Sequence, residues 1–142
     1  MLKKSAVCSV VFSSRMNLIM MGTGDFAVPT FRRLLDQGNR VSLLVTQPDR
    51  PQGRHLELTP APIKRLAMER GVPVFQPESV NTPESISRLA ELSPDLFVVA
   101  AYGQILNDSL LEVPHGGGVN LHASLLPKYR GAAPINWAIY HG

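Results

Sequence analysis

Short apolar runs recur along the chain from Met16 onward, and each is largely apolar instead of alternating with polar residues. Runs of this kind are typical of strands that are buried on both faces of a parallel sheet. The glycine or proline that bounds most of the runs supports the same interpretation. We expect five strands, at residues 17–22, 41–46, 72–77, 96–101 and 117–122.

Segments with apolar residues at helical spacing separate these runs and predict helices. In the first of them, Phe31, Leu34 and Leu35 share one face, and Gly38 is a helix stop signal. The expected helices are residues 28–38, 63–71 and 83–94, a short one within 102–112, and one beginning at 134. Residues 47–62 contain four prolines and are expected to form a long loop. Strands that alternate with helices indicate an α/β fold: an open, mostly parallel sheet with helices on both faces.

The composition fits one folded domain. With 142 residues, 44% of them hydrophobic and 18% charged, the chain can bury a real core and is not of the disordered class. Its net charge of +3 is compatible with an anionic partner such as RNA without identifying one. Cys8 is the single cysteine, so no intrachain disulfide can form and a reducing, cytoplasmic location is expected. No apolar run approaches the ~20 residues that span a bilayer, so we expect no membrane association.

The two ends of the chain differ from this regular part. Lys3 and Lys4 precede a short apolar stretch, as in a signal peptide, but no cleavage site of the usual kind follows. We expect residues 1–15 to be a disordered extension or the result of a misassigned start, and residues 16–142 to form the domain. The chain stops within a helical pattern, so we expect this domain to be incomplete at its C-terminal end.

Functional groups of open parallel sheets gather at the carboxyl ends of the strands. After the first strand, residues 22–27 read GTGDFA, which is close to the glycine-rich fingerprint of dinucleotide-binding proteins. No acidic residue follows the second strand, which ends at Thr46 and Gln47. A tight strand-to-helix turn therefore explains the two glycines better than NAD binding does.

Asn120 and His122 lie two positions apart on the last expected strand, so their side chains should leave the same face. An amide and an imidazole directed at one point could bind a reacting carbonyl: the amide stabilises the developing oxyanion, and the imidazole transfers a proton. Spacing alone leaves open that His122 is only a structural polar residue. Ser124 lacks the frame of a serine hydrolase, and no pair of His or Cys residues has metal-ligand spacing, so we expect no metal site.

The segment NLHASLLPKYRGAAPI, residues 120–135, resembles the signature of folate-dependent formyltransferases. Further stretches, all in the family's order, narrow the resemblance to methionyl-tRNA formyltransferases: MGTGDFAVP, TQPDRPQGR, TPAPIKRLA, GVPVFQP and AAYGQIL. The likeness runs from about Met16 to the last residue. It implies a Rossmann-like domain that transfers the formyl group of 10-formyltetrahydrofolate, as co-substrate, to the α-amine of methionyl-initiator tRNA. It also implies a cytoplasmic monomer.

Matched position by position, the resemblance assigns roles to particular residues. Asn120 and His122 match the catalytic asparagine and histidine of the family, and Phe26 and Arg50 match positions that approach the acceptor end of the tRNA. The folate-contacting stretch matches Ser124, Leu125, Leu126 and Pro127. The family's third catalytic residue is an aspartate that lies further along than Gly142, so the 142 residues alone are expected to be inactive.

Four positions depart from the family pattern. Leu56 and Glu57 stand where a lysine pair usually reaches for the tRNA, and Gly24 and Asn107 stand where prolines are usual. Losing positive charge weakens the attraction to phosphates. This departure leaves open a formyltransferase that acts on an amino-sugar nucleotide. A folate-binding module without turnover is the alternative from outside the enzymes.

Overall fold

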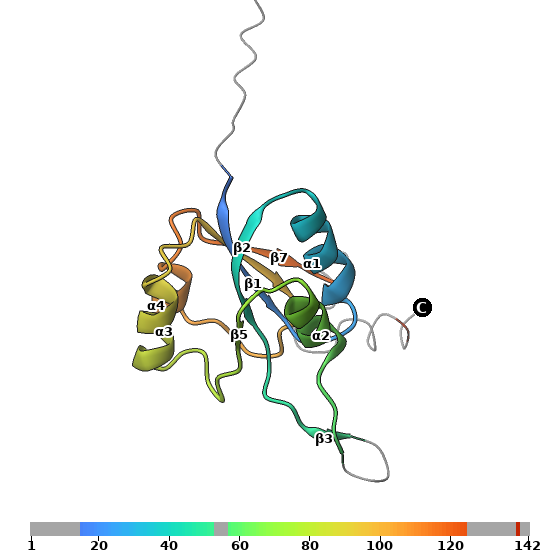
Figure 1. Cartoon of the computed structure of the whole chain (residues 1–142). Coiled ribbons are helices and arrows are strands. Elements are labelled where there is room, and N and C mark those ends of the chain that lie inside the picture. Colours follow the sequence, from blue (N-terminus) through green and yellow to red (C-terminus); the bar gives the residue numbers. More distant parts are fainter. Residues whose placement is uncertain (1–14, 53–56, 125–138, 140–142) are drawn as a thin grey trace, which may run out of the picture.

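The computed structural model describes residues 15–52, 57–124 and 139. A sheet of five parallel strands, in the order β5-β2-β1-β6-β7, forms its centre (Figure 1). The strands are β1 (Asn17–Gly22), β2 (Arg40–Val45), β5 (Val74–Phe75), β6 (Leu96–Ala100) and β7 (Gly118–Leu121). The helices are α1 (Ala27–Asp36), α2 (Pro62–Glu69), α3 (Pro83–Ala90) and α4 (Asp108–Leu111). The expected alternation of strands and helices is confirmed.

Helices cover both faces of the sheet. Leu18 and Met20 of β1 pack with α1 and α2 on one face, whereas Ile19 and Met21 pack with α3 and α4 on the other (Figure 1). All four side chains are at most 2% exposed. Neighbouring residues of a strand point to opposite faces, so a strand covered on both faces must be apolar at every position. This explains the uninterrupted apolar run of β1.

The strand order brings three strand ends together. The chain proceeds from β1 outward through β2 to β5, and then crosses to the other side of β1 to form β6 and β7. The change of direction lies between β1 and β6, whose last residues, Gly22 and Ala100, are register partners. In open α/β sheets such a switch point leaves a crevice at the carboxyl ends of the strands. The ends of β1, β2 and β6 therefore become the place to look for a site.

The prediction of a long loop at residues 47–62 is wrong in part. Within it, β3 (Pro51–Gln52) and β4 (Glu57–Leu58) pair antiparallel, with Pro51 opposite Leu58, and the hairpin projects away from the sheet (Figure 1). Two-residue strands carry no apolar periodicity, so the sequence gives no sign of them. The strand expected at 72–77 shrinks to the two residues of β5.

Helix boundaries follow from local signals. The Thr82 side chain accepts a hydrogen bond from the Ser85 amide at 3.2 Å and caps α3. Asn107, one of the departures from the family pattern, does the same for α4, accepting from the Leu110 amide at 2.9 Å.

The expected extension at 1–15 lies almost wholly outside the described residues, and so does the expected helix from 134, apart from residue 139; both stay predictions. In the described part of the chain, no helix has the length and apolar character that crossing a bilayer requires.

Candidate functional site

A cavity of about 480 Å³ opens at the ends of β1, β2 and β6. Its lining comes from the three segments that follow these strands, together with the segment that leads into α2. The lining residues are Thr23, Gly24, Gln47, Pro48, Asp49, Arg50, Thr59, Ala61, Ala101, Tyr102 and Gly103. Its position at the switch point and its mixture of backbone, hydroxyl, amide and charged groups make it the candidate binding cavity of this domain.

Gln47 joins the strand ends that form the floor of the cavity. Its backbone amide donates to the Thr23 hydroxyl at 3.2 Å, and that hydroxyl donates to the Tyr102 carbonyl at 2.9 Å. Its side-chain amide donates to the same carbonyl at 3.3 Å and accepts from the Gln104 amide at 3.3 Å. One glutamine thus links the ends of β1 and β6 to its own segment after β2, which fixes the shape of the floor.

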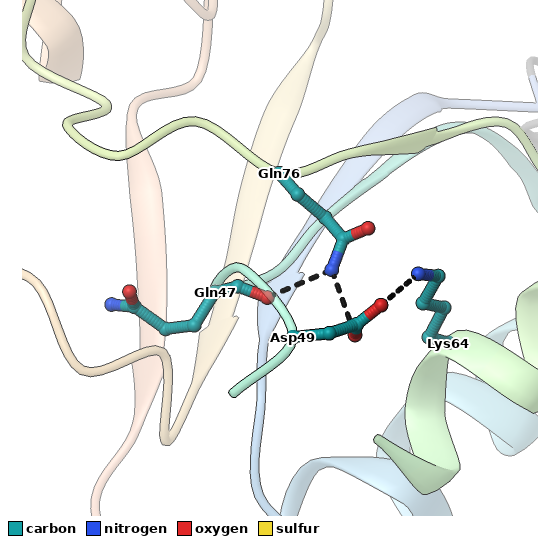
Figure 2. A network of polar contacts seen from close by, with 4 residues as sticks. All are labelled: Gln47, Asp49, Lys64 and Gln76. Carbon is teal, nitrogen blue, oxygen red and sulfur yellow. Dashed lines mark hydrogen bonds and ion pairs between the residues drawn. The ribbon is translucent and has the colours of Figure 1, made fainter. Parts of the chain in front are cut away.

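Asp49 is held from two sides (Figure 2). The Lys64 ammonium on α2 forms an ion pair with Oδ2 of Asp49, and the Gln76 amide donates to Oδ1 at 3.0 Å. The same Gln76 nitrogen donates to the Gln47 carbonyl at 3.0 Å. The hydrogen bond from Lys64, assisted by that from Gln76, keeps the pKa of Asp49 below its ordinary value of 3.8 although partial desolvation opposes it. The carboxylate is therefore charged and fixed in place at neutral pH.

The segment after β6 has an unusual backbone and an orphaned hydroxyl. Ala101 has φ 48 and Gly103 has φ 92, and both line the cavity. A left-handed alanine is strained, and such strain tends to be retained at functional sites. Between them, Tyr102 is 2% exposed and its hydroxyl has no hydrogen-bond partner within the described residues. Burial raises the pKa of Tyr102 to about 12.

The two residues expected to approach the acceptor substrate occupy different places. Arg50 is exposed at the cavity and forms no ion pair with another described residue. Phe26 immediately precedes α1 and is 43% exposed, which leaves its ring accessible, but it does not line the cavity. Of these two residues, only Arg50 lines the cavity.

The expected catalytic residues lie at the end of β7, on the far side of β6 from β1. Asn120 is exposed on the strand and is the register partner of Val99, and His122 is half-buried one residue beyond the strand end. Nδ1 of His122 is 2.9 Å from the hydroxyl of Ser124, so these two expected site residues touch. Neither Asn120 nor His122 lines the cavity. Leu125, Leu126 and Pro127 lie outside the described residues.

Sequence reasoning missed the supporting residues of the cavity. The sequence patterns predict only that Gln47 belongs to a loop, Lys64 to a helix and Gln76 to a strand. Lys64 is half-buried and directly follows Ile63, which is fully buried in α2. A lysine next to a core position of a predicted helix is the one sequence signal that could have indicated a partly buried ion pair. No group of three or more His, Cys, Asp or Glu side chains among the described residues could hold a metal ion.

Comparisons with known proteins agree with this architecture. The family profile described as formyl transferase matches residues 14–142. The chain is 56% identical over 127 residues to the methionyl-tRNA formyltransferase of Geobacter metallireducens, and 54% identical over 128 residues to that of Caldanaerobacter subterraneus. Each alignment covers 89% of this chain and 41% of the relative, so the chain spans about two fifths of the length of these curated relatives.

A solved structure, the phosphoribosylglycinamide formyltransferase of Bacillus halodurans, resembles this one with a TM-score of 0.68 at 23% identity. The superposition covers 89% of this chain and 66% of that chain. At this identity the likeness bears on the fold alone. It confirms the expected Rossmann-like α/β architecture.

Proposed function

Because the chain belongs to the formyl transferase family, we propose that it forms the catalytic domain of a methionyl-tRNA formyltransferase. Its reaction is the transfer of the formyl group of 10-formyltetrahydrofolate to the α-amine of methionyl-initiator tRNA, in the cytoplasm. The observation that carries the proposal is the 56% identity over 127 residues to a protein of that name. The proposal applies to the whole natural protein that contains these residues, since the relatives are more than twice as long as this chain.

The chemistry requires little of the protein beyond charge stabilisation and proton transfer. The neutral α-amine attacks the formyl carbon, a new C–N bond forms, and negative charge collects on the formyl oxygen. The bond from that carbon to N10 of the folate then breaks, the amine loses one proton, and N10 gains one. Asn120 stabilises the oxyanion by donating its amide hydrogen, and His122 donates to the same oxygen or relays the proton to N10.

The contact between His122 and Ser124 favours this role for the imidazole. We take the Ser124 hydroxyl to donate to Nδ1 across the 2.9 Å separation. The proton of the neutral ring then resides on Nε2, the nitrogen that does not contact Ser124, from which it can be donated to a substrate. Ser124, Leu125, Leu126 and Pro127 together form the folate-contacting stretch of this proposal.

The acceptor substrate is assigned to the cavity and its surroundings. Arg50 supplies a cation that suits a phosphate near the aminoacyl end of the tRNA, and a guanidinium can bind phosphate oxygens in pairs. The accessible ring of Phe26 suits stacking or apolar contact with that end. Both roles predict binding effects more than effects on the chemical step.

The direct test is a formyl-transfer assay with the 10-formyl folate donor and two acceptors. The proposal expects formylated methionyl-tRNA and no product with an amino-sugar nucleotide. Formylation of the sugar alone would overturn the tRNA assignment in favour of the related sugar enzyme. Folate binding by calorimetry without transfer to either acceptor would leave a binding module and end the enzymatic proposal.

Two substitutions test the catalytic residues. Asn120→Ala should lower kcat about 10²–10³-fold, the usual cost of one oxyanion donor, and His122→Ala should lower it about 10²–10⁴-fold. His115→Ala is the matched control, because His115 is an exposed histidine in the turn before β7. It should retain normal turnover, and near-normal rates in both site variants would refute the assigned roles.

A further inference from the structure

Two neighbouring residues of opposite charge, Asp49 and Arg50, line the cavity. An uncompensated carboxylate beside the guanidinium would repel an anionic ligand that the guanidinium attracts. Neither residue is paired with the other in the structure. Asp49 instead forms its ion pair with Lys64, which lies on α2 and does not line the cavity.

Both oxygens of the Asp49 carboxylate are bound on the side of α2 and β5. Lys64 approaches Oδ2 from the first turn of α2, and Gln76 approaches Oδ1 from the residue that follows β5 (Figure 2). The Lys64 and Asp49 side chains are only 19% and 22% exposed. An ion pair so shielded from water is weakened by solvent less than a surface pair is. The carboxylate is therefore bound, and its negative charge is compensated by Lys64, before any ligand arrives.

We propose that Lys64 is a positioning residue of the acceptor site, which neutralises Asp49 and so keeps the Arg50 guanidinium available for a phosphate group of the acceptor substrate. The inference rests on the proposed function, and it assigns to Lys64 a role that acts entirely through Asp49. Without the ammonium, the carboxylate adds a negative charge to the cavity wall. Phosphate binding weakens, whereas the chemistry at the end of β7 is unaffected.

A purely mechanical role for Lys64 makes a different prediction. If the ion pair served only to clamp the 47–50 segment to α2, any loss of the pair would disturb the cavity, whether or not the carboxylate kept its charge. Removing the charge of Asp49 together with that of Lys64 therefore separates the two roles. Asparagine has the shape of aspartate, and its carbonyl oxygen can still accept the Gln76 hydrogen bond.

The test uses steady-state formylation of methionyl-tRNA by the longest natural polypeptide that contains these residues. Lys64→Gln should raise the acceptor KM about 10-fold, the lower end of what a hydrogen bond to a charged group contributes. The kcat and the KM for the folate donor should change less than about twofold. Lys64→Arg, which keeps the charge, should behave as wild type. Arg65→Gln is the matched control: it removes one positive charge from the exposed adjacent position of α2 and should leave all constants unchanged.

The double variant Lys64→Gln with Asp49→Asn decides the matter. The proposal expects the acceptor KM of the double variant to return to within about threefold of wild type. The double variant leaves no unpaired charge at this position, so it can still be measured if Lys64→Gln alone fails to fold. A double variant as impaired as the single one would overturn the electrostatic role, as would an equal effect of Arg65→Gln. A wild type that transfers no formyl group to methionyl-tRNA would overturn the proposed function, and this inference with it.

Discussion

Replacing Gly22 by alanine would insert a methyl group where the fold has no space for one. Gly22 ends β1 and is buried between α1, α2 and β6. A Cβ at this position would lie 2.7 Å from Cβ of Ala27 and 2.8 Å from the carbonyl oxygen of Ala100. Ordinary contacts between carbon atoms are about 3.5–4.0 Å. The first residue of α1 and the end of β6 would both have to move away by up to about 1 Å.

The expected cost follows from this overlap. Overpacking of a well-packed core costs about 1–3 kcal/mol, and at Gly22 one of the two close atoms belongs to the backbone of a central strand, which cannot rotate aside. In a domain of this size each kcal/mol lowers Tm by about 4 °C. The measurement is urea unfolding followed by circular dichroism. The free energies of unfolding of wild type and variant are compared where both depend equally steeply on the urea concentration.

Gly24 supplies the matched control two residues away. Its added Cβ would meet only Cβ of Ala101, at 3.8 Å, which is an ordinary contact, and its φ is not positive. Gly24→Ala should therefore change the free energy of unfolding by less than about 0.5 kcal/mol. If Gly22→Ala proves no less stable than Gly24→Ala, the close approach of α1 and β6 at the end of β1 is wrong.

Four more outcomes are expected. Tyr102→Phe should raise the free energy of unfolding by about 1 kcal/mol in thermal or urea denaturation, because it removes a buried hydroxyl without a partner; a loss would show that the hydroxyl is bonded. The wild type, whose Tyr102 has a folded pKa of about 12 against an ordinary 10.0, should lose stability relative to that variant as the pH rises above 10.0, because the unfolded chain then releases the proton first. Asn107→Ala should cost about 1 kcal/mol through the lost cap of α4, whereas Asn107→Asp should cost little. The stability advantage of wild type over Asp49→Asn, present above pH 3.8, should shrink as the pH falls below that value, because the unfolded chain then binds the proton more readily than the folded one; an advantage unchanged down to pH 2 would contradict the Lys64 pair.

The main strands and helices were predictable from local patterns. β1 has the bounds that its apolar run indicates, and α1 begins one residue before the expected helix. Both signals are contained within a dozen residues of sequence. The hairpin of β3 and β4 was not predictable, because its pairing of Pro51 with Leu58 depends on how two polar segments meet in space.

The candidate site was only partly predictable for a similar reason. The rule that groups gather at strand ends directs attention to the segments of Arg50 and His122, but only the strand order shows that one lies at the cavity and the other does not. The partners of Asp49 are 15 and 27 residues away in the sequence, on elements whose relative placement no local pattern contains. Such contacts emerge from packing and not from periodicity.

The central position of β1 has a consequence for the synthesis of the protein. β1 emerges from the ribosome before β6, its neighbour on one side, because an interval of 73 residues (Thr23–Asp95) separates Gly22, the end of β1, from Leu96, the start of β6. At about 5–20 residues per second, translation of that interval takes about 4–15 s. For this time an apolar strand has one edge without its partner, and unpaired edges invite association between chains. Residues 17–22 of the nascent polypeptide are therefore a segment that a holdase chaperone can bind during this interval.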